Sequence, residues 1–305
     1  MAGNSLRVVC GPTAAGKSAV ALWLAERHRA AIVSADSRQV YRGFDIGTAK
    51  PTAADRARVP HYGVDVLDPT ARYSAAAWAA DVERWLAEIA HAGRTPLIVG
   101  GTGFYLRALF GTMFDGPPLD DARRRDLGEF FGGFSVSELR RWCRMLDPER
   151  AHLGRTQLLR AVEVALLTGH RLSDLHRRHP RPARWRARYL LVDPGPALGA
   201  RIEARVDAML AAGWLDEVRA LVETVPGAAP AWKASGYGAL RAVAAGEESP
   251  ARARERVIVE TRQYAKRQRT WFRHQLAGSD VTPLDPSRPD WRDRAEAWWQ
   301  GGEEA

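Results

Sequence analysis

The sequence predicts an α/β fold in which helices flank a parallel sheet. Apolar, strand-like stretches alternate with helical patterns over the first hundred residues, which is the order of βαβ units. The strand-like stretches are 6–10, 31–34 and 96–99, and the helical patterns are 16–29 and 74–92. A glycine-rich segment joins the first stretch to the first helix, and a fourth strand-like stretch follows at 189–192. We therefore expect a single parallel sheet built from both ends of the chain.

The glycine-rich segment, Gly11-Pro12-Thr13-Ala14-Ala15-Gly16-Lys17-Ser18, matches the phosphate-loop pattern G-x-x-x-x-G-K-[ST] between a strand and a helix. Its backbone N–H groups and the helix N-terminus favour an anion. Lys17 would meet the outer phosphate, and the Ser18 hydroxyl would meet a phosphate-bound Mg²⁺. The fold is thus predicted to be P-loop NTPase-like, although a plain glycine-rich turn is the alternative. The predicted diphosphate ligands in the loop are Gly11, Thr13, Ala14, Ala15, Gly16, Lys17 and Ser18.

The middle of the chain predicts an all-helical insertion. The turn-forming segment 115–118 precedes a region, 120–178, that shows only helical patterns rich in arginine. We expect a core formed by 1–112 and 189–305, interrupted by a helical domain at 113–188. Helices at 198–212 and 215–225 should pack back on the core.

Composition restricts the class of protein. The 305 residues are 46% hydrophobic and 27% charged, as in a globular protein, and no apolar run is long enough to span a bilayer. The N-terminus lacks a signal-peptide layout, and the two cysteines, Cys10 and Cys143, are expected to be reduced thiols of a cytoplasmic protein. The net charge of +9 favours a polyanionic partner such as nucleic acid. A high-GC genome, which favours Arg and Ala codons, would be an alternative explanation for the many arginines.

Two residues at predicted strand ends are candidates for catalysis. Asp36 follows the second strand, where carboxyl ends line a ligand crevice, and it could act as a general base, as a metal-shell carboxylate or only as a turn cap. Thr102 stands in Gly100-Gly101-Thr102-Gly103 after the third strand, where an NTPase would carry a Mg²⁺-binding aspartate. A hydroxyl among glycines suits a diphosphate leaving group better than ATP hydrolysis, although a tight turn also explains the glycines.

Basic residues on two predicted helices could meet anions. Arg262, Lys266, Arg269 and Arg273 fall on one helical face with aromatic residues interleaved. Such a stripe can follow a nucleic-acid backbone, but a solvated surface helix is the alternative. Arg201 and Arg205 lie one turn apart, and one of them could reach a phosphate.

Seven stretches of the chain together resemble the tRNA dimethylallyltransferase, or tRNA isopentenyltransferase, family. They are 11–18, 34–52, 60–69, 73–78, 100–109, 235–240 and 261–273. The resemblance implies a bacterial-type enzyme, since no Cys/His pair supports the zinc finger of eukaryotic relatives. It implies transfer of a dimethylallyl group from dimethylallyl diphosphate to N6 of adenosine 37, 3′ of the anticodon, in tRNAs reading codons that begin with U. We accordingly expect diphosphate to leave, Mg²⁺ to be the cofactor, and a monomer to grip the tRNA anticodon stem-loop with its helical insertion.

The resemblance also implies roles for individual residues. Asp36 would accept the proton of the adenine amine, while Lys17, Ser18 with Mg²⁺, Thr102 and Arg205 would stabilise the departing diphosphate. The target adenosine would be flipped into a pocket between two substrate channels. The residues implied to contact tRNA are Asp36, Ser37, Arg38, Gln39, Arg124, Gln157, Arg160, Tyr237, Gly238, Arg262, Lys266, Arg267 and Arg269.

The chain departs from the family pattern at 153–163, which is shortened, so that Arg155 or Gln157 would have to replace a missing RNA contact. Two other functions stay open. An adenylate isopentenyltransferase would act on free AMP, ADP or ATP, but it needs neither the insertion nor the basic C-terminal helix. An RNA-binding P-loop NTPase or small-molecule kinase would need an acid where Thr102 stands.

Overall fold

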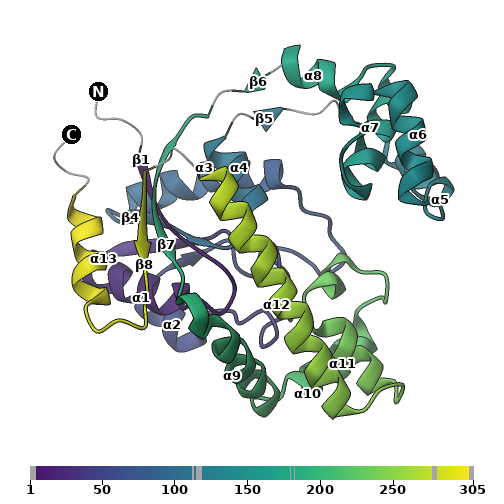
Figure 1. Cartoon of the computed structure of the whole chain (residues 1–305). Helices are drawn as coiled ribbons and strands as arrows, with labels where there is room; N and C mark the ends of the chain where they lie inside the picture. The colour runs from purple at the N-terminus through teal and green to yellow at the C-terminus, as the bar shows by residue number, and fades with distance from the viewer. Residues whose placement is uncertain are drawn as a thin grey trace. The chain divides into compact units, whose positions relative to one another are not determined.

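The computed structural model describes residues 5–111, 113–114, 119–178, 180–181, 183–276 and 280–301 (Figure 1). They belong to two compact units, one formed by Met1–Phe110 with Arg184–Ala305 and the other by Gly111–Ala183. The expected linker at 115–118 lies outside the described residues.

The first unit contains a six-stranded sheet in which every neighbouring pair is parallel. In spatial order its strands are β3 (His61–Tyr62), β2 (Ala30–Ser34), β4 (Thr95–Gly100), β1 (Ser5–Cys10), β7 (Arg186–Val192) and β8 (Asp280–Leu284). The predicted strands correspond to β1, β2, β4 and β7, so the α/β prediction is confirmed. The two edge strands were not predicted, because β3 has only two residues and β8 contains Pro283, which an edge strand tolerates.

Helices cover both faces of this sheet. On one face, α1 (Lys17–Arg27) and α13 (Trp291–Gln300) enclose a core that includes Val9, Leu97 and Trp298. The opposite face is covered by α3 (Ala75–His91) and α4 (Gly103–Phe110), around Val8 and Trp78. Val8 and Val9 join different cores because successive strand residues point to opposite faces. Burial on both faces is typical of a parallel sheet.

A third core lies among the helices that follow β7. They are α9 (Leu198–Ala211), α10 (Trp214–Thr224), α11 (Tyr237–Ala244) and α12 (Pro250–Gln275). Phe44, Trp214 and Tyr237 are fully or almost fully buried in this core, which fixes the loop after β2 against α10 and α11. The long helix α12 packs against α4, α9 and α11 (Figure 1). It therefore reaches from the sheet to this third core.

The second unit contains α5 (Asp121–Phe130), α6 (Val136–Leu146), α7 (Arg155–Thr168) and α8 (Leu172–Arg178). Its core is formed by Phe131, Leu139, Leu158 and Val162, among others. An antiparallel pair, β5 (Met113–Phe114) with β6 (Pro180–Arg181), joins the entering and leaving chain, which the helical pattern did not indicate. The remaining elements are α2 (Ala53–Arg58) and the 3₁₀ turns Pro148–Arg150, Gly195–Ala197 and Pro230–Lys233. Among the described helices, none combines the length and apolar composition that a membrane crossing requires.

Candidate active site

The phosphate loop connects β1 to α1 through a strongly curved backbone. Gly11 has φ 144°, and a Cβ there would lie 2.1 Å from the carbonyl oxygen of Val192 on the neighbouring strand. Ala14 and Gly16 also have positive φ, of 61° and 99°. Alternation of backbone handedness produces a concavity in which N–H groups converge, and such a concavity binds anions. The loop therefore has the geometry of a phosphate site.

Two cations and one carboxylate meet beside this loop. Lys17 Nζ donates a hydrogen bond to the carbonyl oxygen of Pro12 at 2.7 Å. Burial, followed by the charge of Arg205, lowers the pKa of Lys17 to about 8, while Asp36 acts in the opposite direction. Burial also lowers the pKa of Arg205, again against the effect of Asp36. An excess of buried positive charge favours an anionic ligand.

The phosphate-side cavity, of about 610 Å³, lies between the loop and α9. It is lined by Gly16, Lys17 and Ser18 on one side and by Arg201 and Arg205 on the other. The guanidinium of Arg201 lies so close to the loop that a Cβ on Gly16 would be 2.9 Å from its Nη2. Both arginines of α9, and not one of them, therefore face the phosphate loop.

A central cavity of about 80 Å³ shares Arg205 and Met209 with the phosphate-side cavity. Asp36 lines it, together with the apolar side chains of Ile202, Met209, Trp214 and Val257. The carboxylate predicted as the base thus stands beside a small space whose wall is partly apolar and partly polar.

An aromatic-side cavity of about 690 Å³ shares Arg38, Ser235 and Tyr264 with the central cavity. Its lining includes Ser37, Thr102, Trp232, Gly238, Tyr264, Arg267 and Trp271. Because neighbouring cavities share wall residues, the three follow one another from the phosphate loop to the aromatic side. Asp36 stands at the middle of the series.

Asp36 and Thr102 each accept a hydrogen bond from a backbone N–H group. Asp36 Oδ1 accepts from the backbone N–H of Arg38 at 2.8 Å, so the turn-cap role expected as an alternative is also present. Thr102 Oγ1 accepts from the N–H of Ser37 at 3.1 Å, which joins the ends of β2 and β4. Burial, with the charge of Asp36 adding to it, raises the pKa of Tyr264 to about 12, and a hydrogen bond with Thr102 opposes this. Tyr264 therefore stays neutral at physiological pH.

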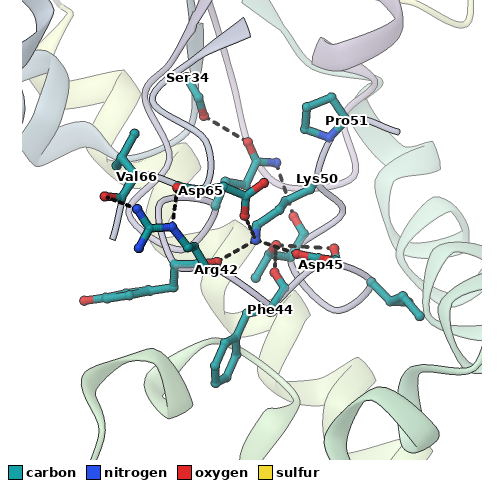
Figure 2. A network of polar contacts seen from close by, with 12 residues as sticks. Ser34, Arg42, Phe44, Asp45, Lys50, Pro51, Asp65 and Val66 are labelled. Atoms are coloured by element: carbon teal, nitrogen blue, oxygen red, sulfur yellow. Dashed lines mark hydrogen bonds and ion pairs between the residues drawn. The ribbon is translucent and has the colours of Figure 1, made fainter. Parts of the chain in front are cut away.

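Gln39 uses its amide inside the protein. Its Oε1 accepts from Ser34 Oγ at 2.9 Å, and its Nε2 donates to the carbonyl of Ala49 at 3.0 Å (Figure 2). Both ends of the side chain thus fix the loop after β2. The structure gives Gln39 a role in loop order, and the tRNA contact implied by the resemblance stays a prediction.

Lys50 orders the loop that carries Asp36, and the sequence did not reveal this role. Its Nζ donates to the Tyr41 carbonyl, to Asp45 Oδ1 and to Asp65 Oδ1, each at 2.5 Å (Figure 2). Arg56 adds a second ion pair to Asp65 at 2.6 Å. The signal available in the sequence was a lysine surrounded by glycines and acids in the long loop that carries Asp36. Its contacts could not be assigned without the fold.

Comparison with known proteins identifies the family of the chain. The model of the IPP transferase family matches residues 39–275, and that of the isopentenyl transferase family matches residues 4–59. A tRNA dimethylallyltransferase of Anaeromyxobacter sp. (strain Fw109-5) is 43% identical over 286 residues, covering 92% of this chain and 95% of the relative. The chain belongs to the tRNA dimethylallyltransferase family. A relative with the same name from Stenotrophomonas maltophilia (strain K279a) is also 43% identical, with 91% of each chain covered.

Solved structures of similar proteins extend over nearly the whole chain. A tRNA delta(2)-isopentenylpyrophosphate transferase of Staphylococcus epidermidis is 31% identical, with a TM-score of 0.66 and 96% of each chain covered. The full-length tRNA isopentenylpyrophosphate transferase of Bacillus halodurans is 30% identical, with a TM-score of 0.69, covering 98% of this chain and 96% of that one. A eukaryotic dimethylallyltransferase acting on tRNA shares the fold, with a TM-score of 0.79 at 24% identity, over 97% of this chain and 78% of that one.

The basic residues of α12 in this dimethylallyltransferase-family chain divide into two sets. Arg262 pairs with Glu203 on α9, and Arg269 pairs with Asp193 and also donates to the Gly195 carbonyl at 2.7 Å. Lys266 and Arg267 are exposed, and no carboxylate partner is found for them among the described residues. The predicted stripe is therefore partly neutralised by the protein itself.

In the second unit, two predicted RNA contacts converge on one buried acid. Arg124 Nε and Arg160 Nη1 lie 3.3 and 3.7 Å from Glu163 Oε2, whose side chain is 8% exposed. Gln157 accepts from the N–H of Gly154 at 3.3 Å and so caps its own helix. Arg155 donates to backbone carbonyls, Gly132 among them, and has a structural role. Both side chains are exposed, and the RNA contact expected from Arg155 or Gln157 stays a prediction.

Tyr237 lies in the third core, where its side chain is fully buried. Its hydroxyl donates to Glu217 Oε1 at 2.6 Å, and its ring packs edge-on against Trp214. This burial does not support the contact with tRNA implied by the resemblance. Gly238, in contrast, lines the aromatic-side cavity.

Proposed function

We propose that this chain transfers the dimethylallyl group of dimethylallyl diphosphate to N6 of adenosine 37, 3′ of the anticodon, in tRNAs reading codons that begin with U. The observation that supports the proposal is the series of cavities with Asp36 at its centre. A phosphate site lies on one side of this carboxylate, and an aromatic, basic wall lies on the other. The transfer forms the bond from N6 to the allylic carbon and breaks the bond from that carbon to the diphosphate oxygen.

The phosphate side would lower the barrier to leaving-group departure. Negative charge grows on the diphosphate as the carbon–oxygen bond breaks, and fixed positive groups stabilise that change. Lys17, Arg201 and Arg205 face this space, together with the backbone of the phosphate loop. The apolar lining of the central cavity suits a five-carbon branched hydrocarbon.

Asp36 would accept the proton that leaves N6. The adenine amine is a poor nucleophile, and a positioned base removes its proton as the new bond forms. Asp36 is anchored at one oxygen by the Arg38 N–H, so its orientation is fixed in advance. The Thr102 hydroxyl, held beside Ser37, lines the aromatic-side cavity, and its contact with a phosphate oxygen stays a prediction.

The proposed cofactor is Mg²⁺. Among the residues that the structure describes, no group of three or more His, Cys, Asp or Glu side chains could hold a metal ion. Oxygen ligands for Mg²⁺ would therefore come from the exposed Ser18 hydroxyl and from the diphosphate itself, which is how this ion usually binds in phosphate loops. When bound, the ion neutralises diphosphate charge.

The aromatic side would receive the target base. A base stacked in an anticodon loop is inaccessible, so it must be flipped out, and aromatic and arginine side chains hold such bases. Tyr264 and Trp271 provide rings for the base, and Arg267 provides a positive charge for an RNA phosphate beside it. We assign the anticodon stem to the second, helical unit (Gly111–Ala183), acting within a cytoplasmic monomer.

The experiment that tests the proposal measures transfer of radiolabelled dimethylallyl diphosphate, with Mg²⁺, to an anticodon stem-loop. The stem-loop carries three adenosines at and after the third anticodon position. We expect label in this RNA and its loss when the target adenosine is replaced by guanosine.

AMP and ATP are tested in parallel, because the isopentenyl transferase match over 4–59 covers elements that an adenylate isopentenyltransferase would share. Label in the mononucleotides alone would select that alternative. Hydrolysis of ATP with label in neither acceptor would select a P-loop NTPase or kinase and contradict the proposal.

A further inference from the structure

Gln268, in the middle of α12, is a buried polar residue that joins two loops of the active site. Its Oε1 accepts from the backbone N–H of Thr13 at 2.8 Å, and its Nε2 donates to the carbonyl of Gly101 at 2.8 Å. The residue is only 7% exposed. Buried amides with both ends paired fix the geometry of their partners, because an unpaired end would be costly.

The two partners of Gln268 belong to the phosphate loop and to the turn after β4 that lines the aromatic-side cavity. Thr13 is part of the phosphate loop, and Gly101 immediately precedes Thr102. A Cβ on Gly101 would lie 2.4 Å from Gln268 Nε2 and 3.0 Å from the Gly11 carbonyl, so the three segments are in close contact. Since the Thr13 N–H is donated to Gln268, only the other N–H groups of the loop remain for a ligand at this point.

The same helix forms part of the wall for the target base. Tyr264, Arg267 and Trp271 lie within one turn of Gln268 and line the aromatic-side cavity with it. The Trp271 ring packs against Gly103, so that a Cβ there would be 2.4 Å from the ring. A shift of α12 when a base enters would therefore move the hydrogen bonds of Gln268 directly.

We infer that Gln268 is a positioning residue that couples occupancy of the base pocket to the geometry of the phosphate loop. This inference rests on the proposed function for the roles of the two sides. It requires that the side chain of residue 268 accept a hydrogen bond from Thr13 and donate one to Gly101 at the same time. A side chain that only filled space would not have to do either.

Replacement by glutamate separates these two roles. A protonated glutamate can accept from Thr13 and donate its O–H to Gly101, whereas a carboxylate can only accept and would face the Gly101 carbonyl. Burial raises the pKa of a carboxyl group, so both forms become accessible near neutral pH. Other titratable or charged groups around the cavity are Arg38, Lys233, Glu260, Tyr264 and Arg267, with Lys17 facing Pro12 from α1. These groups are the same in wild type and variant. The transfer rate of Gln268→Glu divided by that of wild type therefore reports the titration of residue 268.

The test compares Gln268→Glu and Gln268→Met with Gln275→Glu and Gln275→Met, which alter an exposed glutamine at the end of the same helix. Single-turnover transfer to the stem-loop, its dissociation constant and thermal melting are measured from about pH 6 to about pH 8.5. We expect Gln268→Met to slow transfer at least tenfold with the RNA dissociation constant within twofold of wild type. The rate of Gln268→Glu relative to wild type should fall at least tenfold as pH rises.

Rates within twofold of wild type for both Gln268 variants at every pH would overturn the inference, as would a loss of RNA affinity equal to the loss of rate. If Gln268→Met does not fold, the transfer rate of Gln268→Glu relative to wild type tests the inference. A relative rate that does not change with pH overturns it. If the wild type transfers no dimethylallyl group, the proposed function fails by itself. Binding of inorganic diphosphate with Mg²⁺ then tests Gln268: tenfold weakening by Gln268→Met, but not by Gln275→Met, supports its role, and equal affinity overturns it.

Discussion

Lys50 Nζ lies 2.5 Å from Asp65 Oδ1, and this ion pair closes the long loop that begins at Asp36. The Lys50 side chain is 2% exposed, and Arg56 approaches the other oxygen of Asp65. Burial by itself would raise the pKa of Asp65, but the hydrogen bonds from Lys50 and Arg56 hold it below its ordinary value. The loop is thus ordered by buried charge rather than by regular secondary structure.

We predict that Lys50→Met destabilises the protein by about 1–3 kcal/mol, because the Tyr41 carbonyl and the partly buried carboxylate of Asp65 lose a charged hydrogen-bond donor. Urea unfolding at pH 7 measures the effect, and Lys266→Met, at an exposed position, is the matched control. A change below about 1 kcal/mol would show that water replaces Lys50 and that the ion cluster does not order the loop.

Asp36→Asn should lower single-turnover transfer at least about 100-fold, because a positioned base contributes about 10²–10⁴ to such a rate. The amide oxygen can still accept from the Arg38 N–H, so the loop geometry and the RNA dissociation constant should stay within about threefold of wild type. Asp68→Asn, which alters an exposed turn in the same loop, serves as the control. Near-normal transfer by Asp36→Asn would remove it as the base.

Diphosphate binding should depend on pH through Lys17. Its pKa of about 8 in the free protein must rise when an anion binds, so below pH 8 the residue is charged in both states and affinity is maximal. Above pH 8 binding has to take up a proton, and affinity falls as pH rises. Calorimetry of inorganic diphosphate with Mg²⁺ in two buffers measures this uptake near pH 9 and near pH 6.5. In Lys17→Met, the difference in proton uptake between these two pH values should be lost. Proton uptake identical to that of wild type would mean that a group other than Lys17 takes up the proton.

The two sets of basic residues on α12 should differ in their effect on RNA binding. Arg267→Gln should weaken binding of the stem-loop and reduce the slope of log affinity against log salt by about 0.7 to 1, the effect of one phosphate contact. Arg262→Gln should change the slope much less, because Glu203 already neutralises that charge. Equal slopes for Arg267→Gln and wild type would mean that this side chain contacts no phosphate.

Much of the fold and part of the site follow from local sequence. The phosphate loop could be predicted because its glycines, lysine and serine are consecutive and act through the backbone of one turn. Asp36 and Thr102 could be placed near it because the carboxyl ends of parallel strands share one edge of the sheet. The edge strands β3 and β8 could not be predicted, since β3 has only two residues and β8 contains a proline.

The sequence by itself determined the parallel sheet, the phosphate loop, the positions of Asp36 and Thr102 and the helical character of 120–178. Tertiary structure alone decided which basic side chains pair with carboxylates of the protein and which remain available to bind RNA or diphosphate. Arg269 is neutralised by Asp193, 76 residues earlier, and Gln268 reaches Thr13 across 255 residues. The spacing of charges along a helix gives the face on which they lie, but not what packs against that face. The contacts that order this site join distant segments, and only the folded chain brings them within hydrogen-bond distance.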